Sequence, residues 1–281
     1  MENRNISNFG WQARLNVVLG MRDGRCVPVR RSHSGPLVVQ KPFYPEGPGL
    51  CQMIVLHPPG GLVGGDELDL SIRVESGAQG LVTTPAAGKF YRGEGRTARQ
   101  TAHFKVHEGA TLEWLPHETI LYDGALAELG VQVDVDTGGL FAAWEIVCLG
   151  RPAAGERFER GQLAQRMEVW TNGTPLVIER AHYDGGSRIL SAPWGWRGFP
   201  VAATLIANPQ DGSAALDAMR VAAGDPLDGE YYGCTVVNGV VIARYLGSHA
   251  ERARAVLISM WAALRPGLNG REASPPRIWK T

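Results

Sequence analysis

Glycine and proline interrupt this sequence along its whole length, and their spacing constrains the fold more than any other feature. The chain carries 36 glycines and 18 prolines among 281 residues, well above the average usage of about 12% for the two together. They are not gathered into one linker, and breaks recur every ~8–15 residues between short hydrophobic segments. This spacing favours many short strands joined by turns, in a sandwich or stacked-sheet architecture, over alternating strands and helices.

The hydrophobic pattern between the breaks predicts strands. In residues 131–136, valines alternate with polar residues, as on a strand with one buried face. Residues 141–149 are apolar on both faces, which is typical of a strand covered on both sides. Further strand candidates are 15–19, 52–56, 68–74, 102–106, 167–170, 176–179 and 236–245. We detect no internal repeat, and we expect a mainly β fold of stacked sheets that forms one domain over residues 1–281.

Two segments near the C-terminus predict helices, and together they form a small helical element at about 211–266. The first begins at Ser213 and stops at Gly224, a residue type favoured just after a helix. The second opens on a capping box at 248–251, carries one apolar stripe, and ends at Pro266. We expect the stripe to pack against the protein's own sheet, with a stripe that faces a partner as the alternative.

Charge and cysteine usage narrow the class of protein. The chain has 28 basic and 28 acidic residues, and this balance argues against nucleic acid or an anionic membrane as the main partner. Cys26, Cys51, Cys148 and Cys234 form no CxxC pair, which is typical of small buried side chains in a reducing compartment. The N-terminus lacks the apolar core of a signal peptide, and no segment approaches the ~18 apolar residues of a membrane span. We therefore expect a soluble cytoplasmic protein.

Three central motifs combine turn residues with charged or aromatic side chains: HPPGGLVGGD at 57–66, TTPAAGKFYR at 83–92 and LEWLPHETILYDGA at 112–125. None matches a metal-ligand, nucleophile or phosphate-loop pattern. The first favours a pair of tight turns in which Asp66 accepts backbone hydrogen bonds; the alternative is that Asp66 faces a cavity or a partner. The second, basic and aromatic, favours a solvated hairpin or a protein-docking loop over a site for single-stranded nucleic acid.

The histidines do not predict a dedicated metal site. His103 and His107 are four residues apart, but their surroundings alternate as in a strand, which separates them by about 13 Å. They cannot chelate one ion in that geometry. The sequence has no HExxH motif and no paired set of cysteines and histidines.

Three carboxylates lie in apolar surroundings. Glu145 and Glu179 each share a predicted strand face with apolar residues, and Glu113 lies beside Trp114 in the segment LEWLP. An unpaired carboxylate in such a place is costly, so each needs a partner, a water channel or an ion. We expect a structural ion pair with a neighbour such as Arg151 or Arg180, and the other two arrangements remain open.

Taken together, the three motifs resemble the UreD family of urease accessory proteins, called UreH in some organisms. The resemblance extends over nearly the whole chain and keeps the same order of motifs. Matching segments outside the centre are 10–11, 33–36, 40–47, 144–145, 148–151 and 276–279. The chain departs from the family pattern at His117, where the family usually has glutamine, and at 86–88.

The resemblance implies a function as well as a predominantly β fold. Members of this family are scaffolds without catalysis of their own. They bind apo-urease and the accessory protein UreF, and UreF recruits the GTPase UreG, which brings nickel. No tightly bound cofactor is implied, but a transient Ni²⁺ path lined partly by carboxylates is, and the matching acidic positions are Asp66 and Glu179. Oxygen ligands hold Ni²⁺ less firmly than imidazole or thiolate clusters, as a relay requires.

Two competing hypotheses remain. A carbohydrate-active enzyme would use two acids, such as Glu145 and Glu179, in one aromatic-lined cleft, with the carboxyl groups about 5–10 Å apart. A plain adaptor would bind the same protein partners without any metal path. The positions of these carboxylates in the fold discriminate among the hypotheses.

Overall fold

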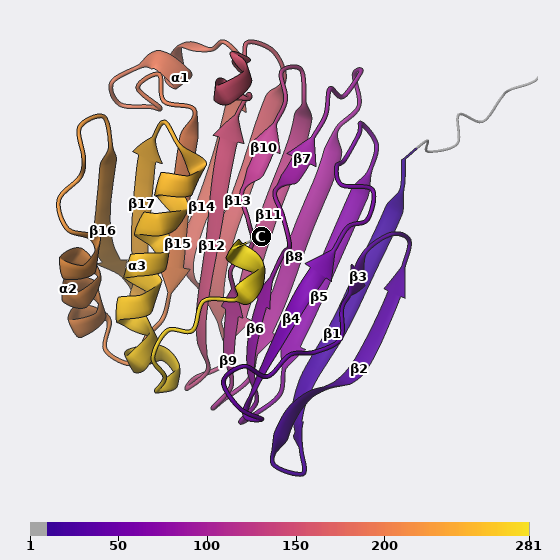
Figure 1. Cartoon of the computed structure of the whole chain (residues 1–281), viewed down its shortest axis with the longest axis vertical. Coiled ribbons are helices and arrows are strands. Elements are labelled where there is room, and N and C mark those ends of the chain that lie inside the picture. The colour runs from indigo at the N-terminus through magenta and orange to yellow at the C-terminus, as the bar shows by residue number, and fades with distance from the viewer. Residues whose placement is uncertain (1–9, 281) are drawn as a thin grey trace, which may run out of the picture.

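The computed structural model describes residues 10–280. Two large β-sheets lie face to face, and helices cover the outer face of one of them (Figure 1). The mainly β, stacked-sheet class expected from the sequence is confirmed.

The smaller sheet has seven strands in the order β14-β13-β11-β8-β5-β1-β2. Neighbours from β1 through β13 pair in parallel, and an antiparallel hairpin partner closes each end of the sheet. Its strands are β1 (Gln12–Arg22), β2 (Arg25–Ser34), β5 (Glu67–Val74), β8 (Ala98–Val106), β11 (Leu126–Val135), β13 (Gln162–Thr171) and β14 (Thr174–Asp184).

The larger sheet has ten strands, with β16-β17-β15-β12-β9-β6-β4-β3 in order and with β10 and β7 attached beside β12. The strands β4, β6, β9 and β12 pair in parallel. The strands of this sheet are β3 (Val38–Val39), β4 (Leu50–Leu56), β6 (Gln79–Thr83), β7 (Gly88–Phe90), β9 (Thr111–Trp114), β10 (Thr119–Leu121), β12 (Leu140–Leu149), β15 (Val201–Ala207), β16 (Tyr231–Val237) and β17 (Val240–Gly247).

In its central part the chain winds as a coil and gives strands alternately to the two sheets. Three successive corners have the same hydrogen-bonded turn, in which the N–H of Ala78, Ala110 or Gly139 donates to the carbonyl three residues earlier. Each turn has a glycine with positive φ at its third position, a conformation that other residues rarely adopt: Gly77, Gly109 and Gly138. The corners stack on one another through backbone hydrogen bonds. The backbone conformation thus repeats from corner to corner, although the sequences of the corners share little more than a glycine at the same position.

Two apolar layers hold the structure together. One fills the space between the sheets, and the other lies between the ten-stranded sheet and the helices. On β12, Phe141, Ala143 and Val147 face the first layer, and Trp144 and Ile146 face the second. The prediction that 141–149 is covered on both sides is therefore confirmed. The helical elements are α1 (Arg188–Ser191), α2 (Gly212–Ala223) and α3 (Ala250–Asn269), with 3-10 turns at η1 (Pro152–Ala154) and η2 (Arg277–Lys280).

The helix α2 agrees with its prediction, because Gly224 forms its C-cap and Asp211 caps its N-terminus. The start and end predicted for α3 are wrong. Its N-cap is His249, without a side-chain cap bond, so the capping box at 248–251 does not form. The helix also continues through Pro266 to Asn269, with Gly270 as its C-cap, since proline removes one hydrogen bond while the last turn keeps burying apolar surface. The apolar stripe of α3 packs on the protein's own sheet, as expected.

The single strand predicted at 236–245 is wrong as well. A hairpin of β16 and β17 occupies this region. Its turn is Asn238–Gly239, where both residues have positive φ, as the tight two-residue hairpin turn requires.

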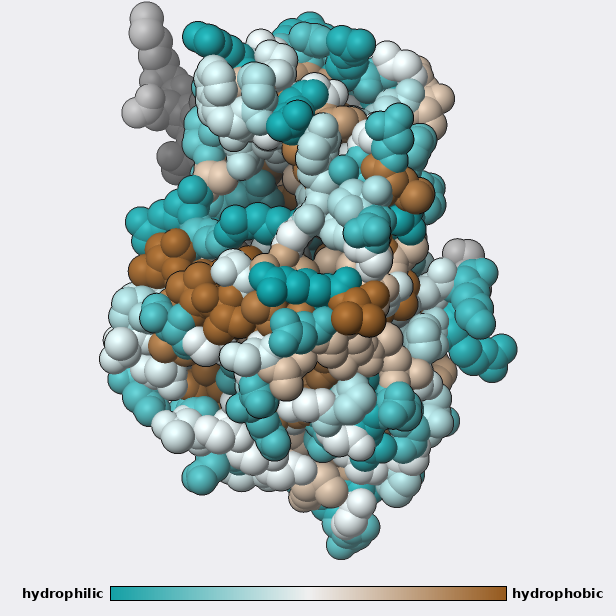
Figure 2. Space-filling model, turned by 90° about the vertical axis from the view of Figure 1, so that its left-hand side faces the viewer, coloured by the Kyte–Doolittle hydropathy of each residue, from teal (hydrophilic) through white to brown (hydrophobic). Residues whose placement is uncertain are grey.

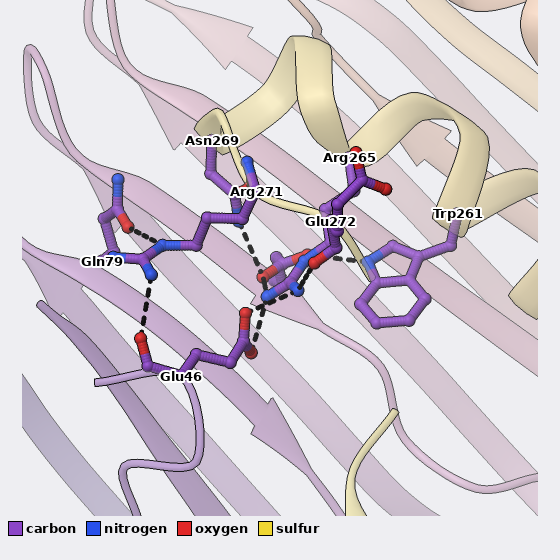
Figure 3. A network of polar contacts seen from close by, with 8 residues as sticks. Glu46, Gln79, Trp261, Arg265, Asn269, Arg271 and Glu272 are labelled. Carbon is purple, nitrogen blue, oxygen red and sulfur yellow. Dashed lines mark hydrogen bonds and ion pairs between the residues drawn. The ribbon is translucent and has the colours of Figure 1, made fainter. Parts of the chain in front are cut away.

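A buried ionic network fastens α3 to the ten-stranded sheet (Figure 3). Glu113 on β9 and Arg265 on α3 are both fully buried and are joined by hydrogen bonds of 3.0 and 3.1 Å. Arg265 also donates to both carboxylate oxygens of Glu46, at 2.7 and 2.9 Å. The indole of Trp261 donates to Glu113 at 2.6 Å. The partner of Glu113 is therefore neither Arg151 nor Arg180, as the sequence suggested, but a residue 152 positions away.

Replacing Arg265 by methionine should strongly destabilise the protein. The substitution removes the charge partner of Glu113 and leaves a buried carboxylate unpaired, and breaking such a pair costs about 3–5 kcal/mol. Chemical denaturation monitored by circular dichroism measures the change. Arg220→Met on the exposed face of α2 is the matched control, with an expected loss below about 1 kcal/mol. A loss in Arg265→Met no larger than in the control would contradict the importance of the network.

Candidate functional site

Two adjoining cavities lie between the sheets and share one residue, Glu145. Cavity 1, of about 200 Å³, is bounded by β4, β5, β8, β9, β11, β12 and the loop at 84–87. Cavity 2, of about 750 Å³, is bounded by β12 to β17 and the segment at 189–196. Each cavity takes walls from both sheets, so together they follow the interior between the sheets.

Glu145 is the polar exception on the inner face of β12. The alternation of the strand places it on the same face as Phe141, Ala143 and Val147, toward the opposite sheet. The side-chain amide of Gln165 donates to its carboxylate at 2.9 Å, and no ion pair to Glu145 occurs within residues 10–280. Desolvation raises the pKa of Glu145 to about 7, and the hydrogen bond from Gln165 opposes this rise. Near neutral pH this carboxyl group is therefore partly protonated.

Glu179 lies in the wall of cavity 2 and is half-buried on β14. Its carboxylate forms an ion pair with Arg244 on β17, so the pair bridges the two sheets. Glu179 and Glu145 thus line the same cavity from opposite sheets.

Asp66 lies outside both cavity walls. Its Oδ1 accepts the N–H of Trp11 at 2.8 Å and its Oδ2 accepts the N–H of Val63 at 2.9 Å, and the residue is buried. The expectation that Asp66 accepts backbone hydrogen bonds in a turn is confirmed. The structure does not bring Asp66 and Glu179 together, but the charge of Asp66 acts on His57, which lines cavity 1.

The arginines expected to pair with the strand carboxylates have other partners. Arg151 pairs with Glu156, and Arg180 pairs with Glu168. Arg180 follows Glu179 directly in the strand, so the two side chains point to opposite faces of the sheet. Pairing with a neighbour in sequence is therefore geometrically unfavourable.

Two histidines of cavity 1 were not predicted to belong to a site. His57 follows β4 and His117 follows β9, and both line the cavity. The Nε2 of His57 and the Nδ1 of His117 are buried without a hydrogen-bond partner. Burial lowers the pKa of both imidazoles, and the nearby Arg254 lowers that of His117 further. Both rings are therefore neutral at pH 7 and keep a nitrogen lone pair.

The loop of the second central motif is also part of cavity 1. Residues 84–87, between β6 and β7, form one side of the cavity. The hydroxyl of Thr84 accepts the backbone N–H of His117 at 2.9 Å, which ties this loop to the segment after β9. The hairpin or docking loop expected from the sequence thus contributes a wall to the interior.

Neither a preformed metal cluster nor a membrane-spanning helix is found in the part of the chain that the structure describes. There, no group of three or more His, Cys, Asp or Glu side chains could hold a metal ion together. None of the helices in residues 10–280 is long and apolar enough to cross a bilayer. All four cysteines are free thiols, with Cys26, Cys51 and Cys148 buried and Cys234 half-buried.

The comparisons with known proteins agree on one family. A family model described as UreD urease accessory protein matches residues 12–280. The urease accessory protein UreD of Dechloromonas aromatica (strain RCB) is 46% identical over 275 residues, which covers 96% of this chain and 95% of that protein. UreD of Nitrosococcus oceani is 45% identical over 273 residues, covering 97% and 91%. UreD of Pseudomonas aeruginosa (strain PAO1) is 42% identical over 271 residues, covering 96% and 95%.

Titration of Glu145 should occur near pH 7 rather than near the ordinary value of 4.5. Carboxyl ¹³C NMR on protein labelled at glutamate measures it, and Glu145→Gln identifies the signal. Gln165→Leu should move the titration to higher pH, because it removes the hydrogen bond that favours the charged form. A titration of Glu145 near pH 4.5 would show that its carboxyl group is well hydrated and would contradict the desolvated position.

Proposed function

The chain belongs to the UreD urease accessory protein family, and we propose that it is a maturation scaffold that helps to deliver nickel to urease through its two cavities. It binds apo-urease and UreF in the cytoplasm, and UreG joins through UreF. The full-length match to proteins named urease accessory proteins supports the maturation function. Nickel is the cargo of this scaffold and not a resident cofactor.

The proposed nickel path rests on one observation, which is that the two cavities share a lining residue. Glu145 lines both cavities, and in the proposed path an ion moves from cavity 1 to cavity 2 past this carboxylate. A single oxygen ligand holds Ni²⁺ weakly enough for release. With a pKa of about 7, Glu145 gains a proton when an ion leaves and loses it when an ion arrives.

The second carboxylate favours release in a different way. Glu179 is already paired with Arg244, so a cation that arrives in cavity 2 competes with this guanidinium for the carboxylate. The competition shortens the stay of the ion. Asp66 supports the path indirectly, because its two backbone hydrogen bonds hold the loop that follows His57.

The surface is compatible with a scaffold that docks proteins. The side of the molecule that carries α2 and β16 shows a band of hydrophobic residues across its middle (Figure 2). Monomeric soluble proteins rarely expose large contiguous apolar patches unless they bind a partner there. Exposed apolar side chains of β14, α2, β16 and the α2–β16 loop are Ile178, Val221, Leu227 and Val237.

One observation supports the alternative that the protein is a carbohydrate-active enzyme. Glu145 and Glu179 do line one cavity, and Tyr183, Trp194 and Trp196 line it too. However, the ion pair with Arg244 occupies the carboxylate of Glu179, which a catalytic pair would need free. The accessory names of the relatives also favour the maturation function.

Replacing the cavity carboxylates should lower nickel loading without releasing the partners. We expect Glu145→Gln and Glu179→Gln each to reduce the nickel content of co-expressed urease several-fold, and the double variant to reduce it further. Asp66→Ala should reduce loading as well, since it frees the loop beside His57. The measurement is urease nickel content, with pull-down of urease and UreF from the same cells. Glu108→Gln, at an exposed corner between β8 and β9, is the matched control.

The outcomes separate the scaffold from the path. If urease is fully loaded with nickel in the presence of every carboxylate variant, while omission of the chain abolishes loading, the scaffold function is supported and the nickel path is contradicted. If urease loads without this chain and nothing co-purifies, the maturation function itself is contradicted, and cavity 2 should be tested with carbohydrate substrates.

A further inference from the structure

We propose that Cys26 and Cys51 are a redox-active thiol pair, which hydrogen peroxide converts into a disulfide bond between the two sheets. Cys26 reacts with the peroxide first, and Cys51 then closes the disulfide. The proposal does not depend on the function in urease maturation, because the two thiols lie outside the walls of both cavities.

The fold brings the two thiols together from different sheets. Cys26 is the second residue of β2, in the seven-stranded sheet, and Cys51 is the second residue of β4, in the ten-stranded sheet. The backbone N–H of Cys26 donates to the carbonyl of Pro48 at 2.9 Å, which holds the start of β2 beside the segment that leads into β4. Both side chains are fully buried in the layer between the sheets. The two thiols are hydrogen-bonded to each other, so a disulfide between them requires little movement of the backbone.

The surroundings of the pair favour a thiolate at Cys26. The hydrogen bond from Cys51 lowers the pKa of Cys26 to about 7 against the opposing effect of burial, and the backbone N–H groups of Gln79 and Cys51 act in the same direction. The same hydrogen bond, together with burial, raises the pKa of Cys51, which therefore keeps its proton. Peroxide oxidises a thiolate and not a thiol, so Cys26 is the residue that reacts first.

Arg25 and Tyr44 connect the buried pair to the surface. Arg25 is exposed, and its guanidinium lies 3.8 Å from the ring centroid of Tyr44, which is half-buried. Tyr44 is a hydrogen-bond partner of Cys51, and the positive charge of Arg25 acts on the same thiol. Hydrogen peroxide is little larger than water, so a small displacement of these two side chains admits it to the sulfurs.

The reaction takes two steps. In the first, the Cys26 thiolate attacks one oxygen of the peroxide; an S–O bond forms, the O–O bond breaks, and the hydroxide that leaves takes up a proton and becomes water. In the second, the sulfur of Cys51 attacks the sulfenic acid of Cys26; the S–S bond forms, the S–O bond breaks, and the oxygen leaves as water with the proton of Cys51. Two electrons pass from the sulfurs to the peroxide. Once Cys26 is neutral, the charge that held the proton on Cys51 is gone, while Tyr44 and Arg25 still favour its thiolate.

The other two cysteines provide an internal comparison. Burial raises the pKa of Cys148 to about 12 and also raises that of Cys234. They lie on β12 and β16, three strands apart in the sheet, which is about 14 Å and too far for a disulfide. Cys234 is half-buried and is therefore more accessible than Cys26. Accessibility alone thus favours oxidation of Cys234, whereas thiolate chemistry favours the pair.

Peptide mapping of the wild-type chain after treatment with hydrogen peroxide tests the proposal. The folded protein is treated, denatured and alkylated with iodoacetamide, and the peptides are identified by mass spectrometry. We expect two of the four thiols to be lost, with Cys26 and Cys51 in one disulfide-linked peptide pair and with Cys148 and Cys234 alkylated. Oxidation of Cys234 before the pair, or four alkylated cysteines after treatment, would overturn the proposal.

Single variants test the order of the two steps. Cys51→Ser should stop the reaction at the sulfenic acid of Cys26, which dimedone labels, and Cys26→Ser should leave Cys51 as a thiol. The double variant Cys148→Ser, Cys234→Ser is the matched control and should form the disulfide as fast as the wild type. Dimedone labelling of Cys51 in Cys26→Ser, without labelling of Cys26 in Cys51→Ser, would contradict the assigned order. If a single variant does not fold, the mapping of the wild-type chain still decides whether the pair forms a disulfide.

Discussion

The stacking of the two sheets depends on one constraint: each turn of the coil must present apolar side chains to the space between them. Parallel pairing in register keeps this face continuous from β1 to β13 in one sheet and from β4 to β12 in the other. A polar group on this face is therefore costly unless it is bonded or has a function. Glu145 is such a group on β12, and it lies where the two cavities interrupt the apolar core between the sheets.

The second apolar layer is fixed by charge rather than by hydrophobic packing alone. Arg265 meets the carboxylates of Glu113 and Glu46, so the helix, the sheet and the loop before β4 converge on one guanidinium. Buried ionic groups of this kind contribute little net stability compared with apolar residues of the same volume, but their geometry permits few alternatives. The network thus ties α3 to the sheet and to the loop before β4 at one point, and the indole of Trp261 donates to the carboxylate of Glu113.

The sequence predicted the parts of the fold that have a strong local signal. Alternation at 131–136 and the doubly apolar segment at 141–149 indicated strands correctly, because side chains on a strand alternate strictly between its faces. The sequence Asn238–Gly239 is an equally local signal, in this case for a tight hairpin turn, but we predicted one continuous strand across it. The helix end at Pro266 was wrong for another reason: burial of the last turn outweighs one lost hydrogen bond.

Prediction of the site was limited by contacts between distant segments. Carboxylates in apolar strands identified Glu145 and Glu179 as unusual, but their partners follow from the stacking of the sheets. Arg244 is 65 positions from Glu179, and no local pattern links them. That His57 and His117 line one cavity follows only when β4, β6 and β9 are known to be adjacent.

The stacked corners at Gly77, Gly109 and Gly138 also bear on how the chain folds. Successive corners are about 30 residues apart, so each new turn of the coil closes a loop of modest length at a modest entropic cost. Each turn then docks on the one made before it, as in repeat proteins, where structure propagates from neighbour to neighbour. The interior between the sheets can therefore grow by the docking of neighbouring turns, and the helix α3 covers the outer face of the ten-stranded sheet.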